Sequence, residues 1–167
     1  VGSDVTGVGT AREGPAAAGY GSTGQAIFGY GVHSSRVSLS NLVSSSGVVA
    51  SDVTGVGTAR NALAAASFGG DKAIFGYGNT GSSVSMTNLV SNTGVVAADV
   101  SGVGTARIQL AAAGYGGDKA LFGFGINSST YYSITNLVNN SGVVASDTTG
   151  VGTIRRSIAA AGYSSSA

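Results

Sequence analysis

The sequence predicts an all-β repeat protein, and two observations support that prediction. A segment reading VGTAR, or a close variant, recurs along the 167 residues, each copy with one arginine: Arg12, Arg60, Arg107 and Arg155. These arginines are separated by 48, 47 and 48 residues, a period typical of repeat architectures. Between them, short apolar runs alternate with Gly, Asn, Ser and Asp, as strands alternate with turns. An ambiguous patch at residues 107–113 is assigned to strand because Gly114 and Gly116 follow too early for a helix.

The period divides the chain into three complete units with a fragment at either end. The units are residues 10–57, 58–104 and 105–152, called units 1, 2 and 3 below. Residues 1–9 match the end of a preceding unit, and residues 153–167 match the start of a further one. We therefore expect a single repeat domain over residues 1–167.

Each unit contains four apolar runs of strand length. In unit 3 they read LAAAGY from Leu110, KALFGFG from Lys119, YSITNLV from Tyr132 and GVVASDT from Gly142. The segments at 68–72 and 115–119 contain Gly-Gly, which predicts tight hairpin turns because Gly adopts positive φ without steric cost. Four antiparallel strands in a unit of this length predict a blade of a β-propeller.

Small side chains predict which strand of the blade is innermost. The first run contains three consecutive alanines, at 64–66, 111–113 and 159–161. Alanine allows neighbouring backbones to approach closely, as inner strands around an axis must. We expect the Phe and Leu side chains of the second and third runs to fill the space between blades.

These units resemble kelch repeats. The resemblance rests on an opening arginine, in TARNAL from Thr58 and TARIQL from Thr105, and on a second strand that ends in glycines, in AIFGYG from Ala73 and ALFGFG from Ala120. It implies four-stranded blades arranged in a propeller. Two features depart from the kelch pattern: Gly-aromatic-Gly replaces the double glycine, and the chain contains no tryptophan.

The amino-acid sequence of the units is also similar to that of kelch-like repeats in bacteriophage tail and other virion proteins. The segment TNLVSNTGVVAADVSGVGTAR from Thr87 is an example. This resemblance implies a location outside the cell or on a virion, and it implies no mechanism.

Aspartate and arginine recur eight residues apart, the Asp at the end of one unit and the Arg at the start of the next. The pairs are Asp4 with Arg12, Asp52 with Arg60, Asp99 with Arg107, and Asp147 with Arg155. A ring of these charges around a ligand is one interpretation. We favour structural inter-blade pairs, because an identical residue in every unit is what a repeated architecture requires.

Composition argues against catalysis and against several kinds of partner. Charged residues are 9% of the chain and the net charge is +1, which does not suit binding to nucleic acid or an anionic membrane. No apolar run approaches the ~18 residues of a membrane span. Cysteine is absent, His33 is the only histidine and Glu13 the only glutamate. We therefore expect no catalytic residues, no metal site and no cofactor.

The units differ most in the loop between their second and third runs. It reads VHSSRVS from Val32, NTGSSVS from Asn79 and INSSTYYS from Ile126. Binding residues often lie on loops held by a rigid scaffold. The candidate ligand-binding residues are His33, Arg36, Asn79, Asn127, Tyr131 and Tyr132. Neutral drift in a tolerant loop is the alternative.

Together these features predict a non-enzymatic, extracellular structural or binding module. The version we favour is a phage tail or fibre component that recognises a surface glycan. A purely structural repeat protein of a bacterial surface or filament is the alternative, and a propeller hydrolase is a second one. Because known propellers have ~4 to 8 blades, we expect either that copies of the chain complete a ring or that the chain is part of a longer repeat protein. We favour the ring of copies, and other virion proteins are further expected partners.

Overall fold

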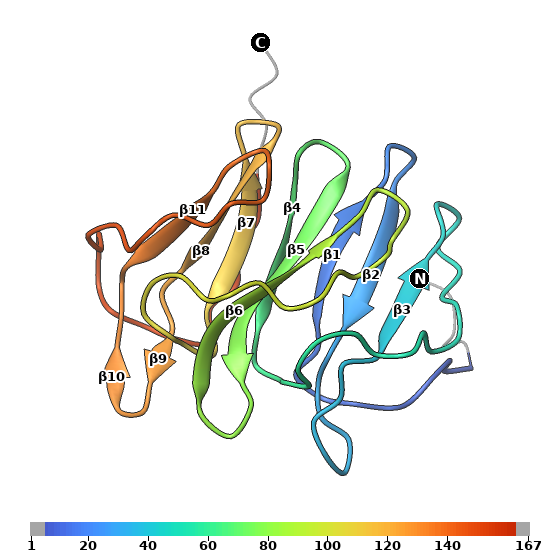
Figure 1. Ribbon diagram of the computed structural model, residues 1–167, viewed down its shortest axis with the longest axis horizontal. Coiled ribbons are helices and arrows are strands. Elements are labelled where there is room, and N and C mark those ends of the chain that lie inside the picture. Colours follow the sequence, from blue (N-terminus) through green and yellow to red (C-terminus); the bar gives the residue numbers. More distant parts are fainter. Residues whose placement is uncertain (1–5, 163–167) are drawn as a thin grey trace.

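The computed structural model describes residues 6–162, which consist of β-strands, turns and loops (Figure 1). All strand pairs are antiparallel, and these residues contain no helix. The prediction of an all-β chain is therefore confirmed.

Each unit contains one three-stranded sheet in which the second strand is central. The sheet of unit 1 is β1 (Ala16–Tyr20), β2 (Gln25–Gly29) and β3 (Ser40–Val43). The sheet of unit 2 is β4 (Ala64–Phe68), β5 (Lys72–Asn79) and β6 (Ser83–Val90). The sheet of unit 3 is β7 (Ala111–Tyr115), β8 (Lys119–Gly123) and β11 (Thr135–Val138), and the short hairpin β9 (Ile126–Asn127) and β10 (Thr130–Tyr131) extends from it. The predicted Gly-Gly hairpins connect β4 to β5 and β7 to β8.

The predicted fourth strand is replaced by an irregular segment. In unit 1 this segment makes isolated bridges, from Val49 to Val43 and from Val53 to Ser40. It spans one more residue between the bridges than β3 does, so a regular ladder cannot form. The Asn41 side chain bonds the freed carbonyl instead, because its Nδ2 donates to Ala50 O at 3.1 Å. The same offset and the same asparagine bond recur in units 2 and 3.

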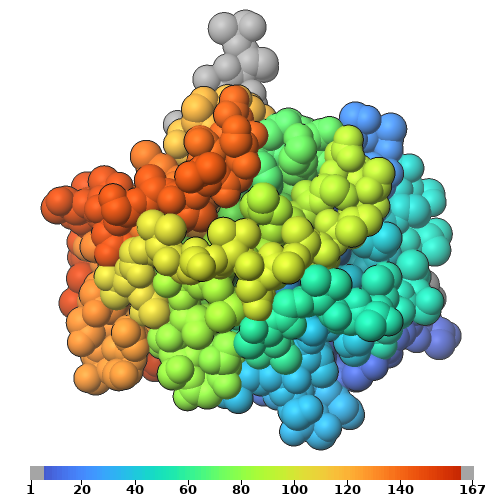
Figure 2. All heavy atoms as spheres, viewed as in Figure 1, coloured from blue at the N-terminus to red at the C-terminus, as the bar shows by residue number. Residues whose placement is uncertain are grey.

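The three sheets stand side by side in chain order (Figure 1). The first strands of successive units are neighbours, with β4 packed between β1 and β7. Ser67 Oγ, for example, donates to Gly19 O at 2.8 Å across this boundary. Figure 2 shows the segments after β3 and β6, coloured teal and yellow, running across the front of the molecule towards the next unit. The described residues form an open row of sheets and no closed ring.

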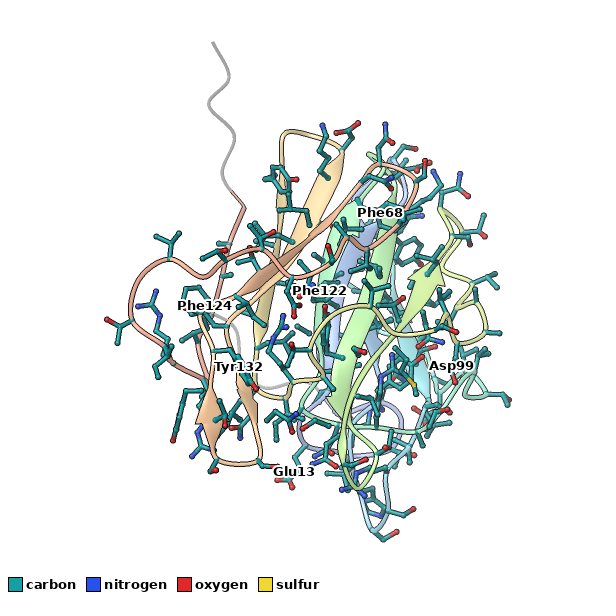
Figure 3. The ribbon with its side chains drawn as sticks, turned by 60° about the vertical axis from the view of Figure 1, so that its left-hand side comes forward. Glu13, Phe68, Asp99, Phe122, Phe124 and Tyr132 are labelled. Carbon is teal, nitrogen blue, oxygen red and sulfur yellow. The ribbon has the colours of Figure 1, made fainter. Side chains whose placement is uncertain are left out.

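Aromatic rings from the second strands fill the space between the sheets, as expected. Phe75 and Phe122 are fully buried, and each lies against a glycine of the preceding unit, Gly29 and Gly76 respectively. Figure 3 shows Phe122 in the interior, between the strands of units 2 and 3. Glycine is required at these two positions because an added Cβ would lie 2.6 and 2.5 Å from the ring.

The Gly-aromatic-Gly motif places a second ring at each boundary. Its aromatic residue has a left-handed backbone in every unit, with φ of 63° at Tyr30, 64° at Tyr77 and 63° at Phe124. The strand register shifts at this point in unit 2, between Gly76 and Gly78. The bulge turns the ring of Tyr77 inward, where it is fully buried and lies 5.1 Å from the Phe122 ring.

The alanine run of unit 2 is buried on alternate residues. Ala64 and Ala66 are buried, whereas Ala65 is half-buried, as is Ala112 at the equivalent position in unit 3. The run at 159–161 is exposed and forms no strand, contrary to the prediction. No described strand pairs with it as β2 pairs with β1.

Candidate functional site

An arginine lies at the centre of a hydrogen-bond network in each unit. In unit 2 the Arg60 side chain is fully buried. Its Nε donates to Tyr77 O at 2.9 Å, its Nη1 to Thr58 O at 3.1 Å, and its Nη2 to Asn88 Oδ1 at 2.6 Å. The planar guanidinium therefore ties together the start of the unit, the end of the second strand and the third strand, which lysine could not do with the same geometry.

Asn88 connects this arginine to the aspartate that follows. Asn88 Nδ2 donates to Asp99 Oδ1 at 2.9 Å. The other carboxylate oxygen accepts from Thr58 Oγ1 at 2.6 Å and from Thr58 N at 3.0 Å. Arg60 Nη1 lies 3.8 Å from Asp99 Oδ1. The fourth segment is thus fastened to the start of its own unit.

The predicted pairing of aspartate with arginine eight residues later is wrong. Each aspartate instead pairs with the arginine that opens the same unit: Arg12 with Asp52 at 3.6 Å, Arg60 with Asp99 at 3.8 Å, and Arg107 with Asp147 at 3.7 Å. The third strand and the fourth segment run antiparallel, so the aspartate returns to the start of its own unit. Asp4 lies outside the described residues.

The arginines do join successive units, but they do so through aromatic rings. The guanidinium of Arg60 lies over the Tyr30 ring of unit 1, 4.2 Å from its centroid. Arg107 lies over Tyr77 at 4.7 Å, and Arg155 over Phe124 at 4.4 Å. A cation over an aromatic face is attracted by the ring quadrupole, most strongly where water is excluded. Arg60 and Arg107 therefore connect their own units to the preceding one, and Arg155 connects the segment after unit 3 to that unit.

Burial shifts the pKa values of this network. Burial lowers the pKa of Arg60, with partial compensation from Tyr30 and Asp99. Burial also raises the pKa of Tyr77 to about 12, despite the opposing charge of Arg107. For Asp99, burial alone would raise the pKa, but hydrogen bonds from Thr58 and Asn88 outweigh it and the pKa is lowered.

We expect acid to destabilise the fold through these carboxylates. The pKa values of Asp52, Asp99 and Asp147 lie below the ordinary 3.8 in the folded chain. A depressed folded pKa stabilises the fold above the unfolded pKa and stops doing so as pH falls through the folded pKa. The free energy of unfolding from urea titrations should therefore be nearly constant from pH 7 to about 5 and fall steeply below about 4.

The matched variant for this acid response is Asp99→Asn, which keeps the shape of the side chain and removes its charge. Its unfolding free energy should depend less steeply on pH below about 4 than that of the parent chain. An identical pH dependence in the two proteins would contradict the assignment.

The buried network is unsuited to binding a charged ligand. Arg60 and Arg107 are fully buried, and the Arg12 side chain is 6% exposed. Their donors already bond to backbone carbonyls and asparagine side chains. A ligand therefore could not reach these guanidinium groups, which favours the structural interpretation of the repeated charges.

The candidate loops lie at one common end of the three sheets, called the loop edge below. They are residues 32–36, 79–82 and 126–132, seen at the bottom of Figure 2 in light blue, green and orange. The hairpin turns at 20–25, 68–72 and 115–119 lie at the opposite end, the turn edge, because each second strand runs from one end to the other. Figure 3 shows Tyr132 and Glu13 in the lower half of the molecule and Phe68 in the upper half.

Two groups of side chains come together on the loop edge. The exposed Arg36 of unit 1 reaches unit 2, where its Nη2 donates to Asn79 Oδ1 at 3.0 Å and its Nε to Asn61 Oδ1 at 3.2 Å. The Arg156 guanidinium, in the segment after unit 3, lies 5.5 Å from the centroid of the ring of Tyr131, a unit 3 residue that is 39% exposed.

The other candidate residues occupy the same edge separately. His33 is exposed in the turn of unit 1, and Asn127 is half-buried at the end of β9. Tyr132 is half-buried, and its backbone N donates to Gly125 O at 3.0 Å. The structure therefore distributes the six residues along the edge and does not gather them into one pocket.

Sequence reasoning missed the role of one repeated residue. Asn41, Asn88 and Asn136 each bond both the arginine and the aspartate of their unit. Asparagine is disfavoured in strands, so its recurrence in SNLV and TNLV was a signal that its side chain has a structural partner.

Comparison with family models and with curated proteins assigns no function to the chain. No family model matches it, and no curated protein matches it. Among residues 6–162, no three His, Asp or Glu side chains gather as a metal site would require. Nothing in the same range qualifies as a membrane-spanning helix.

Proposed function

We propose that this chain is a non-enzymatic binding module, built of kelch-like propeller blades, that recognises a surface glycan through its loop edge. The observation that supports this most directly is the position of the unit-to-unit differences. The arginine network repeats in all three units, whereas the loops at 32–36, 79–82 and 126–132 differ and share one edge. A rigid scaffold with variable loops at one end is a common arrangement of binding proteins.

The side chains of the loop edge suit a neutral or weakly anionic sugar. Tyr131 is 39% exposed, and the cation of Arg156 lies over one face of its ring. Arg36 is held in place by Asn61 and Asn79, so its remaining donors are oriented at little further entropic cost. Short Ser, Thr and Asn side chains around them supply both donors and acceptors.

The proposed setting is outside the cell, as a tail or fibre component of a phage virion. The resemblance of the units to phage kelch-like repeats supports it. Its proposed partners are copies of itself, other virion proteins and a cell-surface glycan. The low charge of the chain, 9% with a net charge of +1, supports partners other than nucleic acid.

A glycan array probed with the full chain tests this function. We expect binding to a limited set of glycans, and we expect Tyr131→Ala and Arg36→Ala each to weaken it by about tenfold or more, equivalent to ~1.4 kcal/mol. Lys72→Ala is the matched control, since Lys72 is an exposed cation on the turn edge and its loss should leave binding unchanged.

The other outcomes separate the alternatives. An absence of glycan binding would contradict the proposal and favour a purely structural repeat protein of a bacterial surface or filament. Release of sugar products from an arrayed glycan would contradict the non-enzymatic assignment and favour a hydrolase. Equal binding by the parent chain and both loop variants would exclude the loop edge as the site.

A further inference from the structure

The joint between successive units follows one pattern, seen twice in the structure. The Phe75 ring of unit 2 lies on Gly29 of unit 1 and packs edge-on to Tyr30, with ring centroids 5.2 Å apart. The Phe122 ring of unit 3 lies on Gly76 and beside Tyr77 in the same way. Each joint is therefore an aromatic ring seated on a glycine.

A second contact completes each joint. The turn after β6 places Gly94 against Tyr20 and Leu42 of unit 1, so that Tyr20 is only 6% exposed. The equivalent turn in unit 3 places Gly142 against Phe68 and Leu89 of unit 2. The covered side of each unit thus offers a glycine seat and an apolar pair, and the covering side offers a ring and a turn.

Unit 1 has the equivalent aromatic ring, but no glycine of another described unit packs against it. Phe28 occupies in unit 1 the position of Phe75 and Phe122, yet it is 42% exposed whereas they are fully buried. The turn of unit 1 is also open, because an added Cβ at Gly47 would meet no atom within 4 Å. Phe28 and the turn at 44–47 define the leading face.

Unit 3 has the equivalent glycine, Gly123, but no aromatic ring of residues 6–162 packs against it. Gly123 is buried within its own unit, where an added Cβ would meet Thr135 Cγ2 at 3.3 Å and Leu121 Cδ1 at 3.7 Å, and no such ring lies within 4 Å of it. Leu137, the counterpart of Leu42 and Leu89, is 41% exposed, and Tyr115 is half-buried where Tyr20 and Phe68 are buried. Gly123, Leu137 and Tyr115 define the trailing face.

We propose that the leading face of one copy binds the trailing face of a second copy, with Phe28 seated on the partner copy's Gly123. A second copy is the expected partner because the two faces carry the same residue types that pack against each other at the two joints within the chain. The contact joins two different surfaces, so it is heterologous and can extend into a ring or a filament. This inference rests on the self-assembly in the proposed function and is independent of glycan binding.

Docking of a second copy requires the segment at 153–162 to move. It occupies the inner part of the trailing face, where Gly125 N donates to Arg155 O at 2.9 Å and Arg155 lies over Phe124. Its sequence, TIRRSIAAAG, parallels TAREGPAAAG at 10–19, so β1 of the incoming copy competes for the same place. Residues 159–162 are exposed and outside any strand, which makes their displacement inexpensive.

Sedimentation velocity over a range of concentrations tests the joint. The full chain should self-associate as concentration rises, and Phe28→Ala should weaken association by about tenfold or more. Gly123→Ala should have a similar effect, because its Cβ would lie where Phe28 must pack, whereas in the isolated chain a small shift of the Thr135 methyl, 3.3 Å away, makes room for it.

Mixing the two variants makes the test specific. The Phe28→Ala chain keeps an intact seat and the Gly123→Ala chain keeps an intact ring, so the mixture should form a one-to-one dimer that cannot grow. Formation of that dimer also shows that both variants are folded. A parent chain that stays monomeric, or a mixture that gives no dimer, would overturn the joint. Glycan binding by Phe28→Ala should match that of the parent chain, which separates this inference from the proposed glycan site.

Discussion

Replacing Arg60 with alanine is expected to lower the free energy of unfolding by about 3–5 kcal/mol, because it leaves two buried acceptors unsatisfied, at ~1–3 kcal/mol each. The guanidinium is fully buried and bonds Tyr77 O, Thr58 O and Asn88 Oδ1. Without it, the buried acceptors Tyr77 O and Asn88 Oδ1 lose a partner, as does the part-buried Thr58 O, and the exposed Asp99 loses its cation. Urea denaturation followed by circular dichroism would measure the change.

Arg155→Ala is the matched control for this experiment. Arg155 is the equivalent arginine after unit 3, and it is exposed over Phe124. An exposed cation–π contact contributes only ~0.5–1 kcal/mol, so this variant should stay close to the parent. Arg60→Lys should recover little of the loss, because an ammonium cannot reproduce the three-way geometry. Equal losses for Arg60→Ala and Arg155→Ala would contradict the importance of burial.

Replacing Phe75 with alanine is expected to cost about 3–5 kcal/mol, the usual range for a buried Phe. The ring is fully buried between Gly29 and Tyr30, so its removal opens a cavity between units 1 and 2. Phe28→Ala, at the same position of unit 1, should cost roughly 1 kcal/mol or less, because Phe28 is 42% exposed. Thermal and urea unfolding in dilute solution, where copies do not associate, would compare the two.

Replacing the glycine under a ring perturbs the same joint in the opposite way, because it adds a side chain where the Phe variants remove one. Gly76→Ala should destabilise by about 1–3 kcal/mol through overpacking, since its Cβ would lie 2.5 Å from the Phe122 ring. Gly123→Ala should cost less than Gly76→Ala in the isolated chain, because its Cβ would meet Thr135 Cγ2 at 3.3 Å and no ring. If Phe75→Ala and Phe28→Ala lost equal stability, or if Gly76→Ala were neutral, the ring-on-glycine joint would not be what holds the units together.

The local features of the fold could be predicted from sequence because they depend on neighbouring residues. Gly-Gly within 68–72 and 115–119 specifies a tight turn, and short apolar runs on either side specify antiparallel strands. The recurrence of Arg12, Arg60 and Arg107 determined the unit boundaries, since the same local pattern folds in the same way each time. These features yielded the all-β class, the hairpins and the order of the first three strands.

The fourth strand could not be predicted because it depends on a contact across the sheet. GVVASDT has the apolar character of a strand, but one extra residue between its bridges prevents a regular ladder. Asn41 and its counterparts bond across that offset, and no local pattern reveals which side chain will do so.

The sequence by itself determined that one aspartate and one arginine recur in every unit, and the tertiary structure decided which of them meet. Asp99 lies eight residues from Arg107 along the chain, yet it pairs with Arg60, 39 residues earlier. Phe28 and Phe75 likewise share a sequence context and differ in burial, 42% against 0% exposed. Charge pairing and burial depend on which surfaces the chain brings together in space, and distance along the sequence does not report that.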